Sequence, residues 1–450
     1  MKTKFLNLAI GLIVLTAMVF APTGLAKAAP SAYSTCFQLQ NLEASIANIT
    51  ISYYAQGSAI SIDVVDTIPA SGSKTYCPLT AVSAGFNGSV VINSTTDLAA
   101  IANVTGGSPA WSGWDASYAG FNAGATTVSI PLLMKGNYGF NTWFNIQNAG
   151  GTADANVGVS YSDGTIHNEI IGVNQAKTFD QSTETHSATV FAASVTSDQP
   201  VVVTVMEVGS PSLPMLFGYN GFTSSTTAPL MPLVMANNYG YSTGIQIQNV
   251  GGSSTNVTVA YTHSVSGTDC TETHTIAAGS STTFALHAWD GTDASNNTCV
   301  NGQTFIGSAK VSVNSASMGL VAIVNQQNFG TNKGAAYGSF DAVAATATVV
   351  FPLIMDRNYG YFTGFNVMNA GTNDATVTCT FTGSAFTVGP TLLTPGQAMT
   401  NTQLNLIANG YVGAATCSAT GTAPKIVGVV NELLNSGTSD TFLVYEGFNK

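Results

Sequence analysis

One twenty-residue segment occurs three times in this chain, beginning at Pro131, Pro232 and Pro352. The copies read PLLMKGNYGFNTWFNIQNAG, PLVMANNYGYSTGIQIQNVG and PLIMDRNYGYFTGFNVMNAG. A shortened copy, CFQLQN, begins at Cys36. Self-similarity at a fixed spacing predicts that each copy belongs to one structural unit that packs beside its neighbours. The chain is therefore expected to fold as a series of four similar units.

A second signature, an aromatic residue followed by x-Gly/Ser-Phe, closes each unit. It ends at Phe121, Phe222, Phe340 and Phe448. Together the two motifs predict a leader at 1–29 and four repeats, at 30–122, 123–223, 224–341 and 342–450.

Hydrophobic periodicity within a unit is that of β-strands. Phe144 and Ile146 alternate with Asn145 and Gln147, which predicts a strand with one buried and one exposed face. Turns rich in Gly, Ser, Asn and Asp separate such strands, and the chain after residue 29 has no sustained helical period. The pattern predicts an all-β protein with four tandem Ig-like antiparallel β-sandwich domains. Their short linkers favour an elongated rod.

The first 29 residues have the pattern of a cleaved secretory signal peptide. Lys2 and Lys4 precede an apolar run from 6 to 20, and Ala26 and Ala28 supply small residues before a cleavage site. A retained N-terminal anchor is the alternative, but a membrane span needs about 20 apolar residues. We expect an extracellular or cell-surface location, with no membrane span in the mature chain.

Composition excludes several classes of partner. The formal net charge is −11 and only 7% of residues are charged, against about 25% in typical soluble domains. An acidic chain without a basic patch is not expected to bind nucleic acid.

The six cysteines are typical of an oxidising compartment. Sequence alone allows 15 connectivities. The unit boundaries favour bridges within units, which pair Cys36 with Cys77, Cys270 with Cys299, and Cys379 with Cys417.

The pattern of alternating strands, an Asn-x-Gly turn and later apolar strands resembles the Ig-like repeats of secreted bacterial surface proteins, including those related to CARDB adhesion-type domains. The resemblance covers nearly all of the chain after the leader. It implies tandem β-sandwiches at a cell surface.

The Asn-Tyr-Gly-aromatic element supplies the candidate ligand or interface residues. One interpretation is an exposed aromatic platform that stacks on sugar rings. The other is a tight turn whose aromatics pack at domain junctions, since Asn and Gly favour such turns. The residues concerned are Tyr138, Phe140, Tyr239, Tyr241, Tyr359 and Tyr361.

Other polar motifs are interpreted as structural. Thr183–Glu–Thr–His186 and Thr271–Glu–Thr–His274 place a Glu and a His two residues apart, a spacing compatible with metal ligands on one strand face. The oxygen-rich loop 290–297 lacks the spacing of a calcium-binding loop. We expect no metal, no cofactor and no catalytic residues, because no nucleophile, zinc or phosphate-loop motif is present.

Four units share only three PLxM segments, so one sheet edge is expected to be unfilled. Open edges accept strands from other chains. This predicts head-to-tail self-association.

The function expected is that of a secreted, non-enzymatic surface or matrix protein that acts as a structural spacer, an adhesin or an envelope or filament component. Cell-envelope components and glycans are the other expected partners. A carbohydrate-binding protein that uses the Asn-Tyr-Gly loops is the first alternative. An extracellular hydrolase or its accessory protein is the second.

Overall fold

The computed structural model describes residues 4–8, 33–106, 113–285, 297–314, 318–434 and 439–450, and its regular elements there are β-strands in antiparallel sheets. The all-β fold class predicted from the sequence is confirmed. None of the described residues forms a helix long and apolar enough to cross a membrane.

Seven sheets form four similar units that follow one another along the chain, and we call them units 1 to 4. Unit 1 contains β1 (Lys4–Leu8), β2 (Tyr33–Asn41), β3 (Ala47–Ala55), β4 (Ser61–Ile68), β5 (Ser73–Tyr76), β6 (Gly88–Ser94), β7 (Leu98–Gly106) and β8 (Asp115–Ala119). Unit 2 contains β9 (Ala125–Met134), β10 (Asn141–Asn148), β11 (Ala155–Tyr161), β12 (Ile166–Ile171), β13 (Ala176–Asp180), β14 (Val190–Val208) and β15 (Leu216–Asn220).

The second half of the chain repeats this order. Unit 3 contains β16 (Leu230–Ala236), β17 (Ser242–Asn249), β18 (Thr255–Ser266), β19 (Cys270–Ile276), β20 (Ser281–Phe284), β21 (Phe305–Val313), β22 (Leu320–Asn328) and β23 (Lys333–Gly338). Unit 4 contains β24 (Thr348–Asp356), β25 (Tyr361–Asn369), β26 (Ala375–Phe381), β27 (Thr387–Leu393), β28 (Ala398–Thr402), β29 (Tyr411–Gly421), β30 (Ile426–Leu434), β31 (Phe442–Glu446) and β32 (Phe448–Asn449).

Strand order is the same in every unit. In unit 3 one sheet has the order β16-β21-β18-β19 and the other β20-β17-β22-β23. In unit 2 the long strand β14 belongs to both layers and joins them into one seven-stranded sheet, and unit 4 has an additional strand, β32, beside β24. Apolar side chains from both sheets fill the space between them, as in any β-sandwich.

The PLxM segment lies in the first strand of the unit that follows it in sequence, because β9, β16 and β24 pair with β14, β21 and β29. In unit 4 the short strand β32 also pairs with β24, on its other side. The strand register shifts at the proline of the PLxM segment, and a bulge tolerates a residue without an N–H. The carbonyl of the next leucine accepts a hydrogen bond from the tyrosine of the closing signature: Leu132 from Tyr219, Leu233 from Tyr337, and Leu353 from Tyr445.

The asparagine that ends the repeated segment pins the following turn. Asn249 Nδ2 donates to the carbonyls of Ser253 at 2.8 Å and Ile276 at 3.0 Å, and its Oδ1 accepts from Gly251 N at 2.9 Å. Asn148 and Asn369 make the same three kinds of contact. A buried amide satisfied in this way fixes where each hairpin turns.

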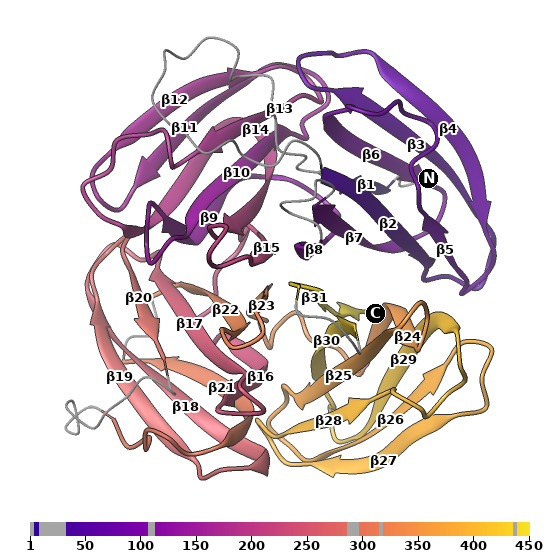
Figure 1. Ribbon diagram of the computed structural model, residues 1–450, viewed down its shortest axis with the longest axis vertical. Coiled ribbons are helices and arrows are strands. Elements are labelled where there is room, and N and C mark those ends of the chain that lie inside the picture. The colour runs from indigo at the N-terminus through magenta and orange to yellow at the C-terminus, as the bar shows by residue number, and fades with distance from the viewer. Residues whose placement is uncertain (1–3, 9–32, 107–112, 286–296, 315–317, 435–438) are drawn as a thin grey trace.

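The four units close into a ring (Figure 1), so the rod expected from the short linkers is wrong. Strands β8, β15, β23 and β31 lie around the centre, and each contacts the next, with β31 returning to β8. Edge strands also pack on the following unit: β9 on β17 and β22, β16 on β25 and β30, and β24 on β2 and β7.

Ring closure also corrects the expectation that β10 and its equivalents have one exposed face. Gln147 and Gln248 are both 0% exposed. That face packs on the preceding unit, where Gln248 Nε2 donates to the Ala193 carbonyl of unit 2 at 3.3 Å. The polar residues of this alternating pattern therefore face a second protein interface and not solvent.

One carboxylate joins all four units at the centre of the ring. Asp440 of unit 4 accepts hydrogen bonds from Leu216 N of unit 2 at 2.6 Å and Gly334 N of unit 3 at 2.7 Å. Its own carbonyl accepts from Asp115 N of unit 1 at 2.9 Å. The side chain is buried, so these contacts replace water that the site excludes.

Unit 1 fills its first edge with residues from the predicted leader. Strand β1 pairs with β6 at the position that β9, β16 and β24 occupy in the other units. Cleavage of residues 1–29 stays a prediction, and most of the leader lies outside the described residues. If it is removed, β6 becomes an open edge.

The Asp440→Asn substitution should destabilise the ring. The amide keeps one acceptor oxygen and turns an NH2 group toward a backbone N–H, which leaves a buried donor unpaired at a cost of about 1–3 kcal/mol. Urea unfolding followed by circular dichroism measures the loss. The matched control is Asp154→Asn on an exposed turn, which should be neutral. Equal stability of the two variants would contradict the role assigned to Asp440.

Candidate functional site

The Asn-Tyr-Gly element is a two-residue hairpin turn in each of three units. Asn238 and Tyr241 form a bridge across the turn, as do their equivalents in units 2 and 4. Tyr239 has φ 49° and Gly240 φ 84°, which are the angles of a type I′ turn. Type I′ turns favour Asn-Gly, because both central residues need positive φ.

The first aromatic of each turn is fully exposed, in a backbone conformation that disfavours it. Tyr138, Tyr239 and Tyr359 are 91%, 94% and 94% exposed, with φ of 47°, 49° and 50°. A non-glycine residue in the left-handed region costs roughly 1 kcal/mol. Burial of the side chain does not offset that cost, since the rings lie in solvent.

The second aromatic of each turn lies at a junction between units. The Tyr361 hydroxyl donates to Asp115 Oδ2 of unit 1 at 3.0 Å. The Tyr241 ring packs edge-on against Phe442 of unit 4, with centroids 5.4 Å apart. Phe140 instead packs on Phe217 of its own unit, at 5.7 Å. The junction packing of the second interpretation is therefore seen for Tyr241 and Tyr361, whereas the first aromatics are exposed and their stacking on sugar rings stays a prediction.

The repeated contacts between units predict that the three exposed tyrosines share one face of the ring. The same strands make the same contacts from unit to unit around the centre. Units related by rotation about one axis present equivalent turns on the same side. We call Tyr138, Tyr239 and Tyr359 the tyrosine tips.

Each junction contains a pair of side chains at equivalent positions of β7, β14, β22 and β30. Glu207 accepts from Asn325 Nδ2 at 2.7 Å across the junction of units 2 and 3. Gln326 and Asn431 exchange two hydrogen bonds, at 3.0 and 2.9 Å, across the next. At the junction of units 4 and 1, Glu432 accepts a hydrogen bond from Asn103 Nδ2 at 3.3 Å. At the junction of units 1 and 2, the equivalent residues are Val104 and Met206, which belong to one hydrophobic core.

A cavity of about 420 Å³ lies at the junction of units 2 and 3, beneath Tyr138. Apolar side chains including Leu132, Phe217 and Phe329 line it, and Glu207 is a polar group in its wall. Gly334 stands where units 4 and 1 have Phe442 and Asp115, the partners of the second turn aromatics, and the Phe217 ring packs against it there.

Glu207 and Glu432 are held in low-dielectric surroundings. Burial raises the pKa of each to about 8, opposed by the hydrogen bonds from Asn325 and Asn103. The second carboxyl oxygen, Oε1, has no hydrogen-bond partner among the described residues in either case. Sequence analysis missed both residues. Their signal was a single acid inside an apolar strand, in Val205–Met–Glu–Val208 and Val430–Asn–Glu–Leu433.

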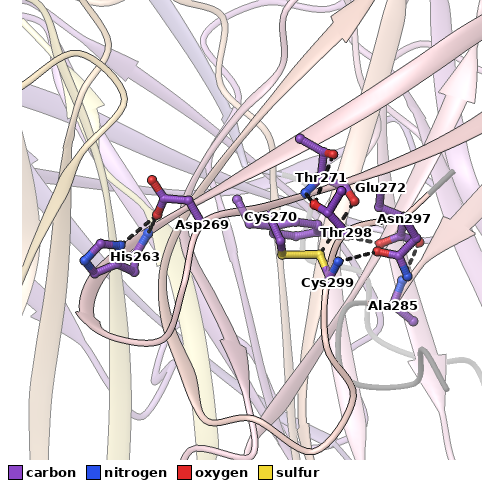
Figure 2. The surroundings of a disulfide bond; sticks show 10 residues. His263, Asp269, Cys270, Thr271, Glu272, Ala285, Asn297, Thr298 and Cys299 are labelled. Atoms are coloured by element: carbon purple, nitrogen blue, oxygen red, sulfur yellow. Dashed lines mark hydrogen bonds and ion pairs between the residues drawn. A yellow bond between two sulfur atoms is a disulfide. The ribbon is translucent and has the colours of Figure 1, made fainter. Parts of the chain in front are cut away.

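The three disulfides join Cys36 to Cys77, Cys270 to Cys299 and Cys379 to Cys417, the pairs that the unit boundaries favour. Figure 2 shows the second of these, with Glu272, on the same strand as Cys270, close to Ala285 and Asn297. Disulfides in this number are typical of an oxidising compartment.

The glutamate of each Thr-Glu-Thr-His motif accepts a hydrogen bond from a tyrosine at the equivalent position of its unit. Tyr261 donates to Glu272 at 2.8 Å, and Tyr161 donates to Glu184 at 3.1 Å. The motif at 271–274 lies in a strand, whereas the motif at 183–186 lies in a turn. Among the described residues, no group of three or more His, Cys, Asp or Glu is arranged to hold a metal ion. Most of the loop 290–297 lies outside the described residues.

Comparisons with known proteins leave the family open. No family model and no curated protein matches the sequence. Among solved structures, the chain is similar to a tetra-tandem repeat from the extending region of a large adhesion protein, at 12% identity over 90% of this chain and 92% of that one, with a TM-score of 0.11. A TM-score this low carries no argument, so the CARDB-type resemblance stays a prediction.

Stability should fall as pH rises from about 5 to 8. Glu207 and Glu432 have folded-state pKa values of about 8, above the unfolded value of about 4.3, so the folded state binds more protons between these limits. Each carboxyl contributes a slope of up to about 1.4 kcal/mol per pH unit. Urea unfolding at pH 5, 6.5 and 8 measures it. The E207Q/E432Q double variant should flatten the slope, and an unchanged slope would contradict the assignment.

Proposed function

We propose that this protein is an extracellular, non-enzymatic surface protein of adhesin type, in which a rigid ring presents the tyrosine tips to saccharides. The observation that carries the proposal is the exposure of three tyrosines in type I′ turns, where Asn would be the more stable residue. Selection for stability alone does not account for the same unfavourable choice at three turns.

Saccharides suit such tips for a chemical reason. A tyrosine ring offers an apolar face to the C–H face of a sugar, and its hydroxyl offers a hydrogen bond at the edge. Each tip alone presents a small area and should bind weakly. Three tips on one face of a rigid ring supply the avidity that a polymeric or surface-bound ligand needs.

The extracellular assignment rests on two independent features. The first is the leader pattern at 1–29, and the second is the set of three disulfides. An acidic ring with few charged residues is compatible with a protein exposed at a cell surface.

The triple variant Y138N/Y239N/Y359N tests the proposal. Asn favours the left-handed conformation, so the variant should be as stable as the wild type or more stable, by up to about 1 kcal/mol per site. On a glycan array, and on intact cells or cell-wall polysaccharide, it should lose binding, while single variants lose only part of it. The readout separates binding from folding, because stability does not fall.

The control is Ile60→Asn, which removes another exposed apolar side chain, 83% exposed, far in sequence from the turns. It should leave binding unchanged. The adhesin proposal fails if the wild type binds no saccharide or cell surface, or if the triple variant binds as the wild type does.

A second candidate function, self-association, is supported by the pairing of β1 with β6. Removal of the leader would leave β6 with a free edge, since β3 covers only its other side. The ring already joins unit 4 to unit 1, so head-to-tail growth would have to open it. We propose instead a two-fold dimer in which the β6 strands of two copies pair antiparallel.

Light scattering coupled to size exclusion should show residues 30–450 as a dimer at high concentration. Val91→Lys, on the β6 face turned away from the core cluster of unit 1, should give monomers, because two copies would bring like charges together. The matched control is Val65→Lys on β4, the opposite edge of the same sheet, 78% exposed. A monomer at all concentrations would rule out this dimer.

A further inference from the structure

The cavity at the junction of units 2 and 3 has the features of a ligand site, and these features do not depend on saccharide binding. Its volume of about 420 Å³ lies in the range of small-molecule pockets, roughly 300–1,000 Å³. Its walls come from the β9–β10 hairpin and the end of β14 in unit 2, and from β17, β20 and β22 in unit 3. Because two units build it, the closed ring preforms it.

Two acceptor atoms in its wall lack donors. Glu207 uses Oε2 to accept from Asn325 Nδ2 at 2.7 Å. Within the described structure, neither Glu207 Oε1 nor Asn325 Oδ1 has a hydrogen-bond partner, although both atoms are buried. When Glu207 is ionised, two buried acceptors without donors are costly, and a ligand that brings N–H groups would satisfy them.

The remaining lining favours an apolar body with a positive charge. Phe140, Phe217 and Phe329 line the cavity together with Tyr138, and the described lining contains no Lys, Arg or His. Aromatic faces attract cations, and Glu207 has no cationic partner of its own. Phe329 is 54% exposed and Tyr138 is 91% exposed, so both lie where a ligand would enter.

We propose that this cavity binds a small organic ammonium ion, with its apolar ring among the phenylalanines and its N–H groups on Glu207 Oε1 and Asn325 Oδ1. The ammonium charge replaces the water that the carboxylate lacks. Binding therefore ionises a carboxyl that burial otherwise keeps protonated near neutral pH, and the proton leaves to solvent.

Benzylamine is the probe, and benzyl alcohol is its neutral isostere. Isothermal titration of the full-length secreted protein at pH 7 should show one benzylamine per chain, with benzyl alcohol at least tenfold weaker. Titration in two buffers of different ionisation enthalpy should show the release of up to one proton per amine bound. Equal affinity for the two compounds, or no binding of benzylamine, would overturn the proposal.

The variant E207Q should weaken benzylamine at least tenfold and abolish the proton release, while benzyl alcohol is unaffected. The variant is expected to fold, because unit 3 has Gln326 at the equivalent position and pairs it with Asn431 through two hydrogen bonds. E432Q is the matched control: it changes the same kind of junction elsewhere and should leave both affinities unchanged. Equal losses in the two variants would place the effect outside this cavity.

This test is separate from that of the adhesin proposal. E207Q leaves all three tyrosine tips in place, and the tip variants at Tyr239 and Tyr359 lie outside the cavity lining. A variant that loses either saccharide binding or amine binding can therefore still be tested for the other.

Discussion

The packing of each unit on the next is the constraint on which the remaining structure depends. The second sheet of a unit has its inner face in its own core and its outer face against the preceding unit, which is why Ile323, Val429 and Ile101 belong to the cores of units 2, 3 and 4. A sheet buried on both faces cannot tolerate separation of the units, because apolar area would return to water. Four such contacts in a closed ring reinforce one another.

Closure of the ring requires that the two surfaces at every junction be complementary, and the paired side chains at the junctions show how this is achieved. Three junctions join a Glu or Gln to an Asn, whereas the fourth replaces both partners with Val104 and Met206. Replacing both members avoids a buried polar group without a partner, which would cost more than an apolar contact. Burial of the glutamates at two junctions predicts that the stability of the ring depends on pH, and Glu207 also borders a cavity.

Much of the fold follows from local sequence. Periodicity of two, turn residues and the repeated asparagine predict the strands and hairpins, because these depend on residues close in the chain. The unit boundaries were enough to favour the three disulfide pairs. The turn at Tyr239 was also predictable, but the division between an exposed first aromatic and a more buried second one was not, since it depends on packing partners far away in sequence.

By itself the sequence determined the four-fold repetition, the all-β class and the position of the Asn-Tyr-Gly turns. Only the tertiary structure decided that the units form a ring, that Gln147 and Gln248 are buried, and that Glu207 borders a cavity. The reason is physical: strand periodicity is a local property of alternating side chains, whereas burial of a second face depends on which surface meets it. That surface belongs to a unit about 100 residues away, or, where β31 meets β8, to the other end of the chain.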